Sequence, residues 1–285
     1  MQRVGQTLIR AVQRLQKAGI TTFRLDAQVL LAHALQSTRE EILMNSEQEI
    51  SPEQQALFAS FLLRRTQREP VSHIIGKREF WAMEFIVTKD VLDPRPDSET
   101  LIEAALGCFK DKNAGVRILD IGAGSGCLLL ALLSEFPCAH GVGTDISAAA
   151  LEVASQNAAK LGLANRAEFV LNDLHKGLQE YSFDLIVSNP PYIKKSDIES
   201  LEPELRYEPE LALSGGRDGL DVYRAIIPSA GAFLCHGGWL LMEIGNGQYP
   251  DIEKMLFQER YEEIKGFSDL AGTPRCIAAR NPFKD

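Results

Sequence analysis

Hydrophobic residues near the start of this 285-residue chain recur every three or four positions. That spacing is typical of helices that bury one face. The apolar positions are Val4, Leu8, Val12 and Leu15, then Ala27, Leu30, Leu31, Ala34 and Leu35, then Ala56, Leu57, Phe58, Phe61 and Leu62. Ser51 before Pro52 marks a helix start, because serine caps a helix and proline suits its first position. We therefore predict a helical domain over residues 1–72.

Residues 73–92 have a different pattern. Two short runs, 78–81 and 84–88, flank Ala82-Met83 and predict a β-hairpin linker. Pro94 and Pro96 then hold Arg95 in an extended segment. That segment is either a rigid linker or a wall of an active site, and Ser98 or Asp97 caps the helix that begins near Glu99.

From residue 93 to the end, strand and helix patterns alternate, which predicts an α/β domain with a doubly wound sheet. The predicted strands are 116–121, 140–144, 167–171, 183–188, 238–244 and 275–280. The predicted helices are 97–110, 126–136, 147–161, 219–235 and 250–258. The polar segment 193–220 is long for a connection, so we expect a functional loop there.

A glycine-rich turn joins the first of these strands to its helix. Its residues are Gly122, Ala123, Gly124, Ser125 and Gly126. Glycines let the backbone approach a ligand, and the helix start aims N–H groups at it. Asp120 precedes the turn, where it could hold the methionine end of a cofactor. Asp145, followed by Ile146, ends the next strand, where its carboxylate could accept ribose hydroxyls.

This turn fits NAD or S-adenosylmethionine. The NAD fingerprint is G-x-G-x-x-G. Here the spacing is G-x-G-x-G, with Cys127 at the sixth position, which favours S-adenosylmethionine. After the third strand, Asp173 could bind an adenine amino group and Leu174 could pack on its ring, although Asp173 could instead cap a helix.

The strand 183–188 is followed by Asn189, Pro190, Pro191 and Tyr192. Two prolines have no N–H groups for a strand ladder, so the chain must turn there. Open α/β sheets bind ligands at this end of their strands. Asn189 and the Pro190 carbonyl can accept the hydrogens of a planar NH2 group, while Tyr192 covers its face. We assign catalysis to Asn189, Pro190 and Tyr192, and substrate binding to all four residues; Asn189 also borders the cofactor.

The amino-acid composition does not alter these predictions of fold and site. The chain is 45% hydrophobic and 24% charged, as in ordinary soluble proteins. Its five cysteines form no C-x-x-C pair and its histidines are scattered, so we expect a reducing cytoplasm and no metal site.

Residues 1–70 hold nine Lys/Arg and seven Asp/Glu, so the acid excess lies in the remainder. That argues against a broad nucleic-acid surface. Arg64, Arg65 and Arg68 either recognise a macromolecular partner or form a solvated face.

Taken together, the motifs resemble those of the protein-glutamine N5-methyltransferases that modify peptide chain release factors, the HemK/PrmC family. The similar segments are 95–99 (RPDSE), 120–126 (DIGAGSG), 145–147 (DIS), 189–193 (NPPYI), 208–209 (EP), 215–220 (GGRDGL) and 269–272 (DLAG). The resemblance covers nearly the whole chain. Two departures are Ser98, where threonine is usual, and Asp93, which replaces an apolar residue.

The resemblance implies a Rossmann-like domain with a seven-stranded sheet whose last pair is antiparallel. It implies transfer of a methyl group from S-adenosylmethionine to the glutamine of the Gly-Gly-Gln motif in class I release factors, in support of translation termination. S-adenosylhomocysteine would be the other product, and the helical domain would grip the release factor. We expect a monomer, without a membrane or direct nucleic-acid partner.

Two alternatives remain. The Asn-Pro-Pro-Tyr motif is shared with enzymes that methylate amino groups of adenine or guanine, which bind with strong salt dependence. A non-catalytic cofactor-binding or release-factor-binding module is the other, although Asp120, Asp145 and Asn189 are all present.

Overall fold

A computed structural model describes residues 2–172, 182–269 and 271–282. The chain forms two compact units. The first contains residues 1–77 together with 202–207, and the second contains residues 78–201 and 208–285. Among the described residues, no helix is both long and apolar enough to cross a membrane.

The first unit is a small helical bundle, as its apolar spacing predicts. Its elements are β1 (Gln2–Arg3), α1 (Val4–Lys17), α2 (Phe23–Leu35), α3 (Arg39–Met44), β2 (Glu49–Ile50), α4 (Pro52–Thr66), α5 (Val71–Ile75) and the 3-10 helix η3 (Pro203–Tyr207). The core includes Leu15, Leu31 and Phe58. Ser51 caps α4 as expected, whereas Leu57 is exposed and lies outside the core.

The three arginines in the last turn of α4 and just after it are paired with acidic residues inside this unit. Arg64 binds Glu69. Arg65 is only 5% exposed and bridges Asp26 (2.7 Å) and Glu204 (3.0 Å). Arg68 binds Glu204 at 3.0 Å. Arg65 therefore fits neither of the two interpretations, recognition of a partner or a solvated face, because its charge is buried and paired.

The second unit contains a seven-stranded sheet in the order β10-β11-β9-β8-β5-β6-β7. The strands are β5 (Arg117–Ile121), β6 (His140–Asp145), β7 (Ala167–Leu171), β8 (Phe183–Ser188), β9 (Leu234–Glu243), β10 (Glu262–Ser268) and β11 (Pro274–Arg280). The five strands from β9 to β7 in this order are parallel to one another, while β11 pairs antiparallel with both β9 and β10. The implied antiparallel last pair is present, and β10 is a strand that the sequence pattern did not predict.

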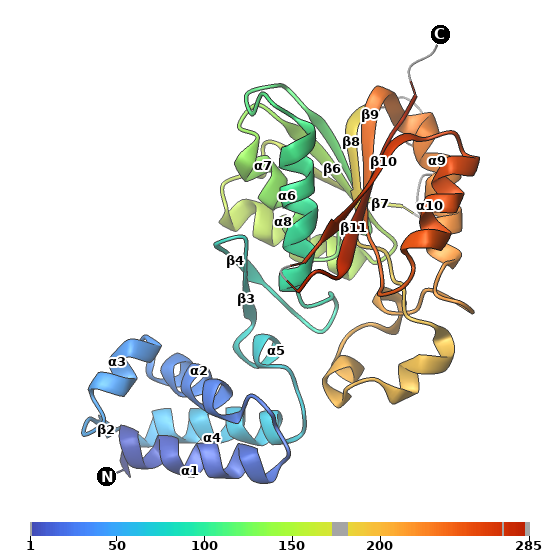
Figure 1. Ribbon diagram of the computed structural model, residues 1–285. Coiled ribbons are helices and arrows are strands. Elements are labelled where there is room, and N and C mark those ends of the chain that lie inside the picture. Colours follow the sequence, from blue (N-terminus) through green and yellow to red (C-terminus); the bar gives the residue numbers. More distant parts are fainter. Residues whose placement is uncertain (1, 173–181, 270, 283–285) are drawn as a thin grey trace. The chain divides into compact units, whose positions relative to one another are not determined.

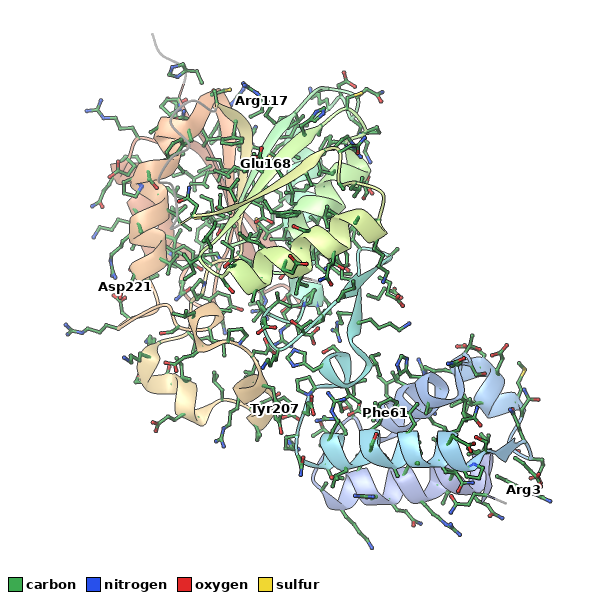
Figure 2. The ribbon with its side chains drawn as sticks, turned by 180° about the vertical axis from the view of Figure 1, so that it is seen from behind. Arg3, Phe61, Arg117, Glu168, Tyr207 and Asp221 are labelled. Atoms are coloured by element: carbon green, nitrogen blue, oxygen red, sulfur yellow. The ribbon has the colours of Figure 1, made fainter. Side chains whose placement is uncertain are left out.

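Helices cover both faces of this sheet (Figure 1). They are α6 (Glu99–Cys108), α7 (Cys127–Glu135), α8 (Ala148–Lys160), α9 (Asp221–Phe233) and α10 (Tyr249–Gln258). Leucines of α7 pack in one apolar layer, and Tyr223 and Ile252 pack in the other. Figure 2 labels Arg117 at the amino end of β5 and Asp221, the first residue of α9, toward the other end of the unit.

The predicted hairpin is formed by β3 (Lys77–Phe80) and β4 (Met83–Ile86). Its turn is Trp81-Ala82 rather than Ala82-Met83. Both turn residues have positive φ, as a type I′ turn requires. Glu99 accepts the Trp81 N–H at 2.9 Å and stabilises this conformation.

The remaining regular elements are short 3-10 helices. They are η1 (Pro96–Ser98), η2 (Lys195–Ser200) and η4 (Glu210–Ala212). Together with η3, the helices η2 and η4 make up about half of the long segment 193–220 that follows Tyr192. The segment therefore has local regular structure, although it is part of neither the seven-stranded sheet nor the α-helices that cover it.

Asn157 on α8 joins the hairpin to the glycine-rich turn. Its side chain is fully buried. Its Oδ1 accepts the Ile86 N–H at 2.7 Å, and its Nδ2 donates to the Ile86 and Ser125 carbonyls at 3.1 and 2.9 Å. One asparagine thus completes the hydrogen bonding of three backbone groups.

We expect Asn157→Ala to lower the free energy of unfolding by about 2–4 kcal/mol, because those backbone groups lose their partners. Both tryptophans, Trp81 and Trp239, lie in the second unit, so tryptophan fluorescence in urea follows that unit. Gln156→Ala, on the exposed side of the same helix, is the control and should change stability by less than about 0.5 kcal/mol. Equal stability of the two variants would contradict this role.

Candidate active site at the ends of three parallel strands

The pairing of β5 with its two neighbours brings the separately predicted motifs together. Ile121 pairs with Thr144 on β6 and with Ser188 on β8. Because these strands are parallel, the residues that follow them lie at one edge of the sheet. The glycine-rich turn, Asp145 and Asn189 are therefore neighbours around one site.

The glycine-rich turn is wound tightly against β6. The N–H groups of Gly122 and Ala123 both donate to the Thr144 carbonyl at 2.8 Å. Gly126 is the N-cap residue of α7 and has φ +77°, and a Cβ there would lie 3.2–3.3 Å from neighbouring side chains. The left-handed backbone conformation favours glycine at this position, and a side chain would also crowd its neighbours.

Asp145 organises the turn with part of its carboxylate. Oδ2 accepts the Gly124 N–H and Oδ1 accepts the Ser147 N–H, each at 2.9 Å. Each oxygen has a further lone pair, so the carboxylate can still accept hydroxyl groups. The adjoining Ile146 is 53% exposed, which leaves an apolar surface beside Asp145 for a flat ring.

Asp120 is the most unusual acid of the site. It is fully buried, and neither carboxylate oxygen has a hydrogen-bond partner among the described residues. Burial raises the pKa of Asp120 to about 7, and the charge of Asp145 adds to the effect. An unpaired buried carboxylate is costly, and a cationic ligand group beside it would remove that cost.

The Asn189 side chain is held from behind by Ser98. Its Nδ2 donates to Ser98 Oγ at 3.1 Å, and the Ser98 hydroxyl donates to Glu243 on β9. The Tyr192 hydroxyl donates to the other oxygen of Glu243 at 3.3 Å. Burial raises the pKa of Tyr192 far above its usual range, so the hydroxyl keeps its proton.

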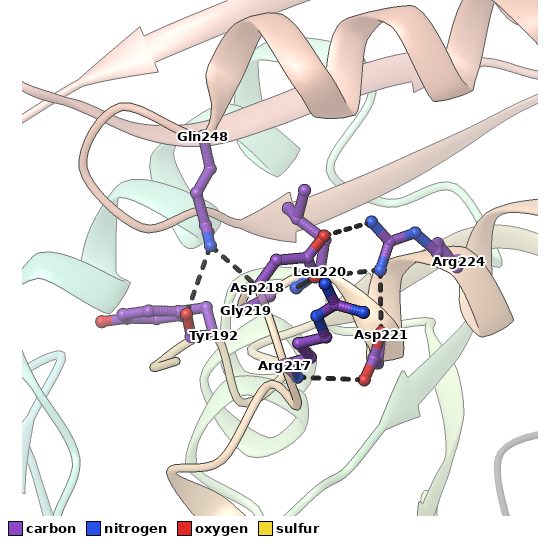
Figure 3. Close-up of polar contacts among 8 residues, drawn as sticks. All are labelled: Tyr192, Arg217, Asp218, Gly219, Leu220, Asp221, Arg224 and Gln248. Carbon is purple, nitrogen blue, oxygen red and sulfur yellow. Dashed lines mark hydrogen bonds and ion pairs between the residues drawn. The ribbon is translucent and has the colours of Figure 1, made fainter. Parts of the chain in front are cut away.

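The backbone around Tyr192 is fixed by Gln248 (Figure 3). Its Nε2 donates to the carbonyls of Tyr192 and Gly219 at 3.2 and 3.1 Å, and its Oε1 accepts the Gly245 N–H at 2.9 Å. A Cβ on Gly219 would lie 2.5 Å from the Tyr192 carbonyl oxygen. Only glycine allows this close approach.

The same view shows how the GGRDGL segment is braced. Arg224 donates to Asp218 and Asp221 at 2.9 and 2.8 Å, and the Arg217 N–H donates to Asp221 at 3.3 Å. Exposed ion pairs contribute little stability individually, typically less than about 1 kcal/mol. The segment that they join lies against the Tyr192 backbone, which Gly215 and Gly219 approach closely.

The structure corrects the prediction that Ser98 or Asp97 caps α6. The Ser98 hydroxyl donates to Glu243 instead, and Asp97 binds Arg275 at 3.0 Å. Arg95 binds the buried Glu208. Because the segment contacts Asn189 through Ser98, it borders the site, which favours the wall interpretation over a simple linker.

Two supporting residues were missed by the sequence analysis. Glu243 had one signal, a lone charge at the end of the apolar run 239–242. Gln248 had none, because its role depends on two carbonyls that are distant in sequence. The predicted adenine-binding residues Asp173 and Leu174 lie outside the described residues.

Comparison with known proteins adds family information to this geometry. Residues 6–76 match the PrmC N-terminal domain, and residues 97–202 match the methyltransferase small domain. The chain is 14% identical to the hMettl16 catalytic domain solved with the MAT2A 3'UTR hairpin 1, with a TM-score of 0.59 over 85% of each chain. At this identity, the likeness concerns the fold alone.

Two full-length relatives are much more similar. The release factor glutamine methyltransferase of Cereibacter sphaeroides is 44% identical over 98% of this chain and 99% of its own length. The protein of the same name from Rhodospirillum rubrum is 43% identical over 97% of this chain and 85% of its own length. The chain therefore belongs to the family of release factor glutamine methyltransferases.

Proposed function

We propose that this protein methylates the side-chain amide nitrogen of the glutamine in the Gly-Gly-Gln motif of class I peptide chain release factors. The methyl donor is S-adenosylmethionine, and the products are N5-methylglutamine and S-adenosylhomocysteine. The protein acts in the cytoplasm as a monomer and supports translation termination. The observation that carries the proposal is the oriented amide of Asn189 beside the glycine-rich turn, in a chain whose close relatives bear this name.

The residues around the turn suit the proposed cofactor. S-adenosylmethionine supplies an electrophilic methyl group on a sulfonium when it is bound. The orphaned carboxylate of Asp120 suits the ammonium group of the methionine end. Asp145 suits the ribose hydroxyls, and the exposed side chain of Ile146 suits the adenine ring. The contributions of Asp173 and Leu174 to adenine binding remain predictions.

Asn189 and its neighbours suit an amide substrate. Because Nδ2 of Asn189 donates to Ser98, its Oδ1 is left to accept a hydrogen from the substrate NH2 group. We assign the second hydrogen to the Pro190 carbonyl, and the faces of the amide to Pro191 and Tyr192.

This arrangement of acceptors compensates for the low reactivity of an amide nitrogen. An amide nitrogen is a weak nucleophile because its lone pair is delocalised into the carbonyl. Two acceptors orient the nitrogen and stabilise the positive charge that grows on it during transfer. No strong base is needed beforehand, because the proton leaves after the new N–C bond has formed.

The decisive experiment is transfer of labelled methyl groups to a purified release factor. A factor whose Gly-Gly-Gln glutamine is replaced by alanine, and a mixed RNA and DNA sample, are assayed in parallel. Label on the unaltered factor alone is expected. Label on nucleic acid alone would replace this proposal with methylation of an adenine or guanine amino group.

We expect Asn189→Ala to reduce turnover by about 10²-fold or more, because one preorganised acceptor is lost. Circular dichroism checks that the variant folds. Asn165→Ala, at an exposed position, is the matched control and should retain full turnover. A folded Asn189→Ala variant with near-normal turnover would disprove this role.

Asp120 predicts a pH dependence of cofactor binding. With its pKa near 7, the carboxyl is increasingly protonated at lower pH, whereas a bound ammonium favours the ionised form. Binding below pH 7 must therefore release a proton, so the affinity falls as the pH falls, by up to about tenfold per pH unit.

Calorimetry with S-adenosylhomocysteine, which carries the same ammonium and no methyl to transfer, measures this affinity at pH 6 and 7. Asp120→Asn should bind more weakly at pH 7 and lose the dependence. An unchanged dependence in Asp120→Asn would assign it to another group.

A further inference from the structure

Glu243 is a buried acid for which the proposed chemistry provides no direct task. It ends β9 and is 3% exposed, next to the fully buried Met242 and Ile244. One oxygen accepts the Ser98 hydroxyl, and the other accepts the Tyr192 hydroxyl at 3.3 Å. Its carboxylate therefore contacts the predicted substrate-binding motif directly at Tyr192, and it is linked to Asn189 through Ser98.

The hydrogen-bond directions in this cluster follow from the charge of Glu243. An ionised carboxylate only accepts hydrogen bonds, so the Ser98 proton must point toward it. Ser98 Oγ is then an acceptor toward Asn189, and the NH2 end of the Asn189 amide must face it, as the 3.1 Å contact shows. The Oδ1 end of the amide consequently faces away from Ser98.

We propose that Glu243 is a positioning residue that sets the orientation of the Asn189 amide through Ser98 and holds the Tyr192 ring with its second oxygen. The inference rests on the proposed function, because that orientation presents an acceptor to the substrate NH2 group. An asparagine amide turned the other way would present a donor to a group that is itself a donor.

Fold stability does not account for a carboxylate at this position. Burial raises the pKa of Glu243 to about 7, which means that the surroundings disfavour its charge. Well-packed apolar residues often replace buried charges without loss of stability. An acceptor is needed here by the hydroxyl groups of Ser98 and Tyr192, which both donate to Glu243.

The groups around Glu243 define its titration. Asp97 raises its pKa and Arg275 lowers it, while the hydrogen bonds from Ser98 and Tyr192 also lower it. Among the described residues, the other titratable groups that interact with it are Tyr223 on α9, Cys127 on α7 and Cys276 on β11. Burial raises the pKa of each of these three, so all of them stay neutral between pH 6 and 8.

Protonation of Glu243 should loosen this arrangement. A neutral carboxyl can donate to Ser98 Oγ, which frees the serine proton to point at Asn189. The amide is then no longer restricted to one orientation. With S-adenosylmethionine saturating, we expect kcat to fall as the pH decreases through about 7, because Glu243 gains a proton there.

The first test compares Glu243→Gln, Ser98→Ala and Ser98→Thr in methylation of the release factor. Glu243→Gln and Ser98→Ala should lower kcat by about 10–100-fold and leave KM for the factor within about threefold, because orientation rather than affinity is lost. Ser98→Thr keeps the hydroxyl and should stay within about threefold of the unaltered enzyme. Glu259→Gln, an exposed neutralisation, is the control.

The pH profile separates positioning from a merely structural role. The decline of kcat below pH 7 should be absent in Glu243→Gln and present in Glu259→Gln. Wild-type kcat in Glu243→Gln, or an unchanged decline with pH, would overturn the proposal. Loss of activity in all three site variants with loss of their folded circular dichroism spectrum would do the same, since the role would then be structural.

A second readout needs no turnover. The side-chain amide resonance of Asn189, assigned through its absence in Asn189→Ala, should shift with a midpoint near pH 7 in the unaltered protein and not in Glu243→Gln. A resonance that does not change between pH 6 and 8 would overturn the proposal. If the shift occurs but no release factor is methylated, the positioning role stands and the proposed substrate fails.

Discussion

The parallel pairing of β5 with β6 and β8 is the constraint on which the site depends. Its register places Ile121 opposite both Thr144 and Ser188. Slippage of either neighbouring strand by one residue would invert the faces of its side chains and bury polar groups in the apolar layers. The hydrophobic layers on both faces of the sheet therefore determine, indirectly, where Asp145 and Asn189 lie.

Two buried acids distinguish this edge of the sheet from an ordinary core. Asp120 has unpaired oxygens, while Glu243 has both oxygens occupied by hydroxyl groups. The same physical cost of burial thus has two different outcomes. Asp120 keeps unpaired carboxylate oxygens, which a cationic ligand group could neutralise. Glu243 accepts hydrogen bonds and so sets the direction of two neighbouring hydroxyl groups.

The sequence predicted the elements whose causes are local. Apolar runs gave the central strands within a few residues, and Ser51-Pro52 marked the start of α4. The strand β10 was missed because an edge strand exposes much of its surface and carries a polar sequence.

The bonding of Ser98, the burial of Arg65 and the role of Gln248 depend on partners many residues away, so no local pattern specified them. The structure brings the predicted motifs to one end of the sheet, and their roles in binding and catalysis stay predictions. The hydrogen bonds that support these motifs were not predicted.

The composition of the first unit has a consequence for the modularity of the chain. Segment 202–207 belongs to the helical unit, although it is encoded between β8 and β9 of the other. The polypeptide therefore passes between units three times rather than once. A fragment cut after residue 77 would lack Glu204 and leave the cationic groups of Arg65 and Arg68 without that counter-charge. The helical bundle therefore cannot be transferred to another protein as one continuous stretch of sequence, because residues 202–207 are encoded within the second unit.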